Sequence, residues 1–366
     1  MDEVVKTLRS DFLTQGPKVF EFEKCFANYV GSKYSVAVSN ATAGLHIAVK
    51  SLGLKKGDRI ITTPITFASS ANCARFVGAQ VWFADINPDT YLISFEKTKE
   101  LIESKPKGFF NGIIPVDFAG LSVNLELFRE LANKHDLWII EDACHAPGGF
   151  FTNSSGKKIT CGQAKYSDCS VFSFHPVKHI ACGEGGMVTT NSKKIYEKLM
   201  LLRTHGISKK NIKGDHGAWY YEMQNLGFNY RLTDIQATLG ITQLAKNPNG
   251  IIRRNEIAEN YKRAFEGLVK YQSLPEGILN AYHLFVIEVD NRKGLYNHLR
   301  SRGIYAQIHY IPVHTLQYYK EIGYHAADLS NAENYYNRCI SLPMFPSLTE
   351  EEQNYTINEV KYYLNK

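Results

Sequence analysis

The stretch Cys169-Ser170-Val171-Phe172-Ser173-Phe174-His175-Pro176-Val177-Lys178 begins as an apolar strand, turns at Pro176 and reaches a lysine. Gly183-Glu184-Gly185-Gly186 follows shortly after, and its glycines let the backbone pass close to a bulky flat group. In open α/β sheets, ligands bind where the strands end. The stretch therefore predicts a ligand site at Lys178, although a lysine taken alone is usually a solvated surface residue.

Similar short apolar runs recur outward from this stretch and alternate with amphipathic segments. Strands are expected at 35–39, 59–62, 80–84, 112–115, 137–141 and 169–173, and helices at 43–52 and 125–134. This alternation is typical of an α/β fold with a mostly parallel sheet flanked by helices.

The polar segment 243–250, which contains Asn247-Pro248-Asn249-Gly250, predicts a break between elements. We therefore expect a large domain over 1–245 and a smaller C-terminal α+β domain over 246–366. Strands at 281–290 and 305–308 belong to the smaller one.

Composition limits the function classes. The chain has 366 residues, 44% of them hydrophobic and 21% charged, as expected of a globular protein with about two domains. It holds no run of about 18 apolar residues and starts with the acidic Met1-Asp2-Glu3, so we expect a cytoplasmic protein with no membrane partner. The net charge of +6 is spread along the chain, which favours an anionic small molecule over nucleic acid.

A metal hydrolase is an alternative that rests on Cys161, Cys169, His175, His179 and Cys182. Their spacing contains no paired C-x2-C or H-E-x-x-H element. All seven cysteines are irregularly spaced, so we expect reduced thiols and no metal site.

A second stretch, Leu137-Trp138-Ile139-Ile140-Glu141-Asp142-Ala143-Cys144-His145, delivers two carboxylates to a strand end. An aspartate in such a place can hold the ring nitrogen of pyridoxal phosphate. The alternative for Asp142 is the N-cap of a helix.

A third stretch, Val38-Ser39-Asn40-Ala41-Thr42-Ala43-Gly44-Leu45-His46, opens a helix with small and hydroxyl residues. Backbone N–H groups at a helix start bind phosphate, while a capping role is the alternative for Thr42. Together with Asp142, the Ser173 hydroxyl and the Lys178 amine, the stretch suggests a site for one aldehyde cofactor, pyridoxal phosphate.

The ordered set of motifs resembles the DegT-type sugar aminotransferases, which share the aspartate-aminotransferase fold (fold type I). The resemblance spans nearly the whole chain. It is carried by Thr14-Gln15-Gly16-Pro17, Asn40-Ala41-Thr42-Ala43-Gly44-Leu45, Pro64-Ile65-Thr66-Phe67, Glu141-Asp142-Ala143-Cys144-His145, the Lys178 stretch and Leu226-Gly227-Phe228-Asn229-Tyr230-Arg231-Leu232-Thr233-Asp234. The segments around 172–186, 219–237 and 308–324 resemble the subgroup that aminates a UDP-sugar at C4 in pseudaminic acid biosynthesis.

The resemblance implies a role for each matching residue. Lys178 is the lysine that binds the cofactor covalently, and Asp142 is the partner of its ring nitrogen. The other implied cofactor contacts are Phe67 and His145 at the ring, Thr42, Ala43 and Ser173 at the phosphate, and Asn229 at the phosphate from a second subunit. Arg231, His309 and Tyr310 match positions near the sugar nucleotide.

Simpler interpretations remain open for three of these residues. Phe67 is as well explained by a place in the core, and Asn229 by a turn. Arg231 is as well explained by a surface pair with Asp234.

The function implied is transfer of an amino group from glutamate to the C4 ketone of a UDP-linked 6-deoxy-4-keto N-acetyl sugar, by a homodimer with shared active sites. Alternatives are an aminotransferase for another nucleotide-linked keto sugar, such as a dTDP-sugar, or a sensor without turnover. Relatives that carry histidine in place of the lysine are dehydratases, so Lys178 favours transamination.

Overall fold

An eight-stranded sheet forms the centre of the molecule. The computed structural model describes residues 2–209, 214, 216–326 and 328–366, and its main sheet has the strand order β1-β9-β8-β5-β4-β2-β3-β14. Strand β9 runs antiparallel to both of its neighbours, and the other pairs are parallel. The strands are β1 (Tyr34–Val38), β2 (Arg59–Thr62), β3 (Gln80–Phe83), β4 (Gly112–Ile114), β5 (Trp138–Asp142), β8 (Cys169–Ser173), β9 (Gly186–Thr190) and β14 (His325–Ala326). The predicted fold class is confirmed, and the six predicted strands of this sheet are placed to within one residue at each end.

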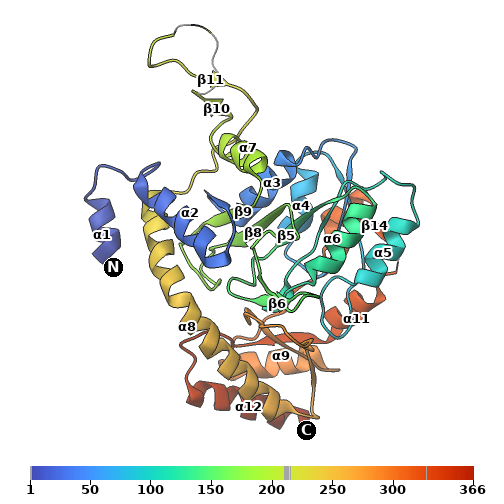
Figure 1. Cartoon of the computed structure of the whole chain (residues 1–366). Coiled ribbons are helices and arrows are strands. Elements are labelled where there is room, and N and C mark those ends of the chain that lie inside the picture. Colours follow the sequence, from blue (N-terminus) through green and yellow to red (C-terminus); the bar gives the residue numbers. More distant parts are fainter. Residues whose placement is uncertain (1, 210–213, 215, 327) are drawn as a thin grey trace.

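Helices cover both faces of this sheet because alternate strand residues are apolar on both sides. In β1, Val36 and Val38 pack in one core and Ala37 in another. One face carries α3 (Ala41–Ser51), α4 (Ser69–Arg75) and α7 (Lys193–Arg203). The other carries α2 (Pro17–Val30), α5 (Phe95–Glu103), α6 (Leu125–Lys134) and the start of α8 (Asp234–Phe265) (Figure 1).

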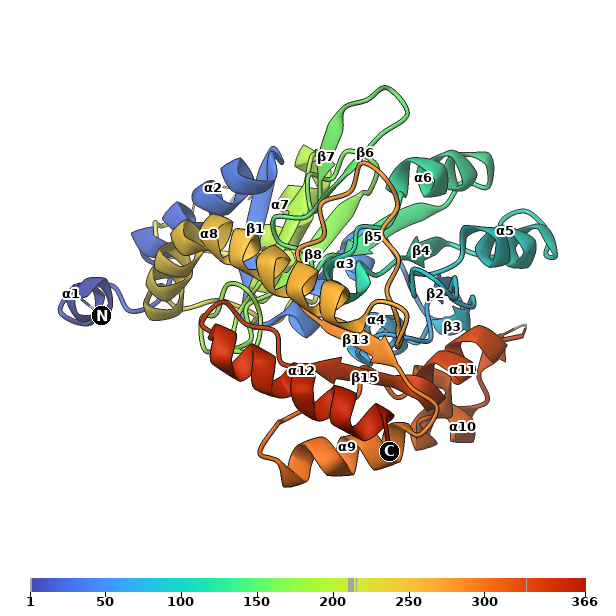
Figure 2. The same ribbon diagram turned by 90° about the horizontal axis from the view of Figure 1, so that it is seen from below.

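A second sheet lies in the C-terminal part of the chain, with the order β12-β13-β15. It is covered by helices and has its own apolar core (Figure 2). Its elements are β12 (Lys270–Tyr271), β13 (Phe285–Glu288), α9 (Arg292–Ser301), β15 (Cys339–Leu342) and α12 (Glu350–Leu364), and the nearby helices are α10 (Gln317–Ile322) and α11 (Ser330–Arg338).

The predicted break at 243–250 is wrong. Helix α8 runs unbroken through Pro248 for 32 residues. Proline lacks one backbone donor, but neighbouring turns bury Leu244 and Ile251. The Asn247 amide also donates to Tyr29 Oη at 2.8 Å and to the Pro147 carbonyl at 2.9 Å. Tertiary packing thus outweighs the local signal, and the proposed division at 245/246 falls inside a helix.

Two predicted strands of the C-terminal part also differ. Strand β13 occupies only Phe285–Glu288 of the expected 281–290. Instead of a strand at 305–308, Gln307 makes an isolated bridge with Ser341, because the sheet pairs β13 with β15.

The segment after α7 projects from the body and carries the short strands β10 (Ile207–Ser208) and β11 (Glu222–Met223) (Figure 1). No helix in the part of the chain that the structure describes is long and apolar enough to cross a membrane.

Candidate active site

The site lies at the ends of β5 and β8, and the alternation of strand residues decides which side chains reach it. Asp142 pairs with Val171 in parallel register. Ile140 and Val171 pack on the α3 side of the sheet, so Asp142 and Ser173, two residues further along, point to the same side. A cavity of about 680 Å³ opens there. Its lining includes Asn40, Ala41, Thr42, Phe67, Asp142, His145, Ser173, Lys178, Glu184, His309 and Tyr310.

The Asp142 carboxylate is buried and held at a fixed position. Ser70 Oγ from α4 donates to its Oδ2 at 2.6 Å, and the Cys144 N–H donates to its Oδ1 at 3.2 Å. Neither donor is a cation. The carboxylate is thus available to a cationic partner in the cavity, and a hydrogen bond to a cation is stronger than one to a neutral donor.

The start of α3 forms the end of the cavity that suits a phosphate. Asn40 is the N-cap and its side chain accepts from the Ala43 N–H at 2.8 Å, so the capping alternative for Thr42 is wrong. Ala41 and Thr42 line the cavity, whereas Ala43 does not. Gly186 of β9 permits this arrangement, because a Cβ there would lie 2.7 Å from the Ala41 nitrogen.

Lys178 reaches the cavity from a tight turn. Its N–H donates to the His175 carbonyl at 2.8 Å, with Pro176 inside the turn, a position that proline favours. The side chain is half-buried, and burial lowers the pKa of Lys178, against the opposing effect of Cys144 and Asp142. Its Nζ lies 3.3 Å from His283 Nε2.

Histidines surround this amine. His145 Nδ1 accepts from the Ala119 N–H at 3.3 Å, which leaves its Nε2–H to donate to Tyr310 Oη at 3.1 Å. His309 Nδ1 lies 2.8 Å from Ser341 Oγ. Burial lowers the pKa of His145 well below its usual range, and burial together with Lys178 lowers the pKa of His309 to about 4. Both rings are therefore neutral at physiological pH.

Phe67 is not a core residue. Its side chain is 62% exposed on the cavity wall, and its ring meets that of Tyr310 edge to face at 6.3 Å. An exposed aromatic face beside Asp142 and Lys178 is suited to stack on a planar ring.

Asn229 and Arg231 are not among the residues that line this cavity. Phe228 and Tyr230 stack at 4.9 Å and pack beside His46 of the same chain. Since alternate residues of extended chain point to opposite sides, Asn229, which is exposed, faces away from the body of the chain. The suggested surface pair is not formed, because the Asp234 carboxylate accepts from the Gly16 and Lys18 N–H groups at 2.8 and 2.9 Å.

Sequence reasoning missed Ser70, Glu184 and His283 as members of the site. Ser70 lies shortly after the recognised segment that ends at Phe67, and Glu184 lies within the quoted glycine-rich turn, so proximity in sequence could have suggested both. His283 is 105 residues from Lys178 and carries no local signal.

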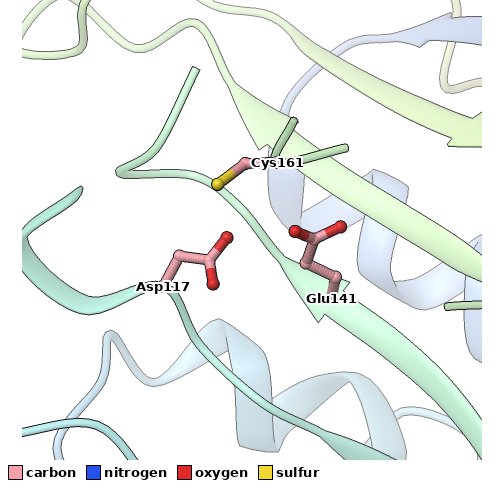
Figure 3. Close-up of side chains that lie close together, drawn as sticks. All are labelled: Asp117, Glu141 and Cys161. Carbon is pink, nitrogen blue, oxygen red and sulfur yellow. The ribbon is translucent and has the colours of Figure 1, made fainter. Parts of the chain in front are cut away.

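Three buried groups lie directly behind the site. Asp117, Glu141 and Cys161 offer ligand atoms within 4.8 Å of one another (Figure 3). Glu141 Oε2 already accepts from Ser170 Oγ at 2.5 Å and from the Gly162 N–H at 3.0 Å. Burial and mutual repulsion raise the pKa of Asp117 well above its usual range, and burial raises that of Glu141. Burial and the nearby Glu141 carboxyl group therefore favour the uncharged form of Asp117.

The cysteines and histidines of the metal alternative are not brought together as a ligand group within the described part of the chain. A second hollow of about 730 Å³ lies near the C-terminus. Four of its charged groups pair with each other, Lys270 with Glu288 and Arg338 with Asp290. The chemistry therefore centres on the Lys178 cavity.

The donor set of that cavity fits pyridoxal phosphate. Helix N–H groups and the Ser173 hydroxyl suit the phosphate, and the Asp142 carboxylate suits the ring nitrogen. The Lys178 amine suits the aldehyde.

Comparisons with known proteins agree with this fit. The DegT/DnrJ/EryC1/StrS aminotransferase family matches residues 1–361. The chain is 37% identical to the spore coat polysaccharide biosynthesis protein SpsC of Bacillus subtilis, covering 99% of this chain and 93% of that protein. It is 34% identical to the UDP-4-amino-4,6-dideoxy-N-acetyl-beta-L-altrosamine transaminase of Campylobacter jejuni, covering 100% and 95%.

Solved structures point the same way. The Helicobacter pylori aminotransferase PseC, involved in biosynthesis of pseudaminic acid, superposes with a TM-score of 0.88 at 31% identity, covering 100% of this chain and 95% of that one. Other similar structures were solved in pyridoxal phosphate and pyridoxamine phosphate forms. The chain therefore belongs to the DegT/DnrJ/EryC1/StrS family of pyridoxal-phosphate-dependent sugar aminotransferases.

Proposed function

We propose that the protein transfers the amino group of glutamate to the C4 ketone of a UDP-linked 6-deoxy-4-keto N-acetyl sugar. The observation that carries the chemistry is the cavity in which the Lys178 amine, the Asp142 carboxylate and the start of α3 meet. The named Campylobacter jejuni and Helicobacter pylori relatives support the choice of sugar.

Bound pyridoxal phosphate supplies an aldehyde that exchanges amines and a ring that takes up an electron pair. Asp142 holds the ring nitrogen in its cationic form. The Lys178 amine, when free, takes the proton from the glutamate Cα, a role that requires an uncharged Nζ. Thr42 and Ser173 anchor the phosphate, and Phe67 fixes the plane of the ring.

The overall exchange balances as glutamate plus keto sugar giving 2-oxoglutarate plus amino sugar. Both substrates use one cavity in turn, so ping-pong kinetics are expected. His309 and Tyr310 lie on its wall and are placed to contact the sugar.

A second candidate is the same reaction on another nucleotide-linked keto sugar, for example a dTDP-sugar. Identity to SpsC, whose name gives polysaccharide biosynthesis and no nucleotide, is higher than to the altrosamine transaminase. This candidate differs in substrate and not in the chemistry at Lys178.

The same proposal includes a homodimer in which Asn229 and Arg231 complete the partner's site. Both follow the projecting segment, where Trp219 is 76% and Leu226 is 69% exposed. Apolar side chains gathered on a projection mark a contact surface. Arg231 then offers a planar cation to the substrate diphosphate.

The test is to incubate the enzyme with glutamate and a panel of UDP- and dTDP-linked 4-keto sugars, and to identify products by mass spectrometry and NMR. The proposal expects amination at C4 of the UDP-linked N-acetyl sugar and no product with Lys178→Ala. Preferred turnover of a dTDP-sugar would establish the second candidate, and the absence of any amino sugar product would overturn both.

A further inference from the structure

His283 is the side chain that meets the Lys178 amine. Its Nε2 lies 3.3 Å from Lys178 Nζ, although it enters the site from the C-terminal part of the chain, just before β13. The ring is only 6% exposed and packs 4.3 Å from the ring of His145. The role inferred for His283 rests on the proposed role of Lys178.

The surroundings of His283 indicate which ring nitrogen carries the proton. Among the described residues, its buried Nδ1 has no hydrogen-bond partner. A buried N–H without an acceptor is rarer and more costly than a lone pair without a donor. The proton therefore belongs on Nε2, which faces Lys178. An Nε2–H can bond to Lys178 only if Nζ offers a lone pair, which an ammonium group does not have.

A fixed positive charge behind the ring opposes its protonation. Arg254 of α8 is buried, and its Nη1 donates to the carbonyl oxygens of Tyr282 and Met344 at 2.9 Å each. Burial is the main cause that lowers the pKa of His283 well below its usual range, and the charge of Arg254 adds to it. His283 is therefore a neutral ring that donates from Nε2.

Four of the other titratable groups that interact with Lys178 do not supply a second such donor. Asp142 and Cys144 favour its charged form. The Nε2–H of His145 donates a hydrogen bond to Tyr310 Oη. The Nε2–H of His179 donates one to the Ala281 carbonyl oxygen, at 2.9 Å. The full set is Asp142, Cys144, His145, His179, His283 and His309.

We propose that His283 is a positioning residue that holds the free amine of Lys178 uncharged by donating a hydrogen bond from Nε2. An uncharged Nζ is the form that attacks an aldehyde and takes a proton from a substrate carbon. Each time the amine is released from the cofactor during turnover, His283 donates a hydrogen bond to it and disfavours its protonation to ammonium.

The test measures the amine itself in the full-length, cofactor-free chain. Proteins are labelled briefly with acetic anhydride across pH, and mass spectrometry of the Lys178 peptide gives the labelling rate, with exposed lysines as internal standards. Only the uncharged amine reacts. We expect His283→Leu to move the midpoint of the Lys178 curve up by about one pH unit, which lowers the labelling rate near neutral pH about tenfold. His283→Gln places an amide N–H where Nε2 was and should keep the wild-type midpoint.

His314→Leu is the matched control, because His314 is also buried but bonds to Glu333 rather than to Lys178. An unchanged midpoint in His283→Leu, or a Gln variant that behaves like the Leu variant, would overturn the proposal. If circular dichroism shows that His283→Leu does not fold, His283→Gln is compared with His283→Ser. Only the Gln variant should then keep the wild-type midpoint of the Lys178 labelling curve. The measurement needs no sugar or cofactor, so its failure is separable from that of the proposed reaction.

Discussion

Glu141 and Asp142 are neighbours in β5, yet their carboxyl groups belong to different environments on opposite sides of the sheet. Asp142 meets Ser70 and the active-site cavity, whereas Glu141 meets Ser170 and the Gly162 N–H on the buried side. The alternation of a strand thus assigns two adjacent acids to two tasks. The Asp142 carboxylate is available for the cofactor. The Glu141 carboxyl group instead links β5 to Ser170 of β8 and to Gly162.

Lys178→Ala should abolish transamination, with a loss of at least about 10²-fold in kcat, because among the described residues no other lysine lines the cavity to move the proton. Product formation from glutamate and a keto sugar is the measurement. Lys157→Ala, which removes an exposed lysine near β7 (Lys158–Thr160), is the control and should retain full rate. Wild-type turnover by the Lys178 variant would refute the assignment.

Asp142→Asn should lower kcat about 10²–10³-fold while leaving the fold intact, since an amide cannot hold a positive ring nitrogen. Steady-state kinetics and circular dichroism check both parts. Ser70→Ala keeps the carboxylate and removes one of its hydrogen bonds, so a much smaller loss is expected. Equal losses in the two variants would mean that the charge of Asp142 is not what matters.

Asp117→Asn should flatten the dependence of stability on pH. The folded-state pKa of Asp117 lies above its unfolded value, so this group's contribution is complete below about pH 4 and is lost as the pH rises through the folded-state pKa. Asparagine keeps the acceptor for the Val123 N–H and places an N–H₂ group toward Glu141 that cannot ionise. We compare the free energy of unfolding of the variant with that of wild type at each pH. This difference should shift in favour of the variant by about 1–3 kcal/mol from acidic to alkaline pH.

Urea unfolding across pH measures this difference. Asp85→Asn is the control, because Asp85 is also buried but accepts from the Asn331 and Ala332 N–H groups at the start of α11. The Asn variant removes one of these two acceptor oxygens, which should cost about 1 kcal/mol at neutral pH, the usual net value of one hydrogen bond. Parallel profiles for wild type and Asp117→Asn would show that folding does not raise the pKa of Asp117.

Mixing Lys178→Ala with Arg231→Ala under subunit exchange should restore about a quarter of wild-type activity. In a twofold dimer with shared sites, half of the molecules are heterodimers, and each has one site free of both defects. Lys178→Ala mixed with Asp142→Asn is the control and should restore nothing, because both residues come from one chain. If exchange is shown by an independent label and Arg231→Ala behaves like this control, Arg231 acts within its own subunit.

The sequence predicted the parts of the site that depend on strand ends and short motifs. Asp142, Ser173, Thr42 and Lys178 follow local elements whose positions were correct within one or two residues, and the structure brings them to one cavity. The resemblance also placed Phe67, His145, His309 and Tyr310 there.

Features that depend on distant contacts were not predictable in this way. Local signals favoured a break at Pro248, but buried contacts on several turns keep α8 continuous. Likewise, His283 reaches the site from a segment 105 residues away, where the Tyr282 carbonyl accepts from Arg254 of another element. Tertiary packing overrides local preference at both positions.

The length of α8 also determines the direction in which each of its later side chains points around the helix axis. The helix starts beside Arg231 and carries Arg254 to the His283 segment, roughly 30 Å further along its unbroken turns. One residue inserted between Thr233 and Arg254 would turn every later side chain by about 100°. Arg254 would then point away from the carbonyl groups that it now binds. Homologous chains should therefore vary in length in their loops and conserve the residue count of this helix.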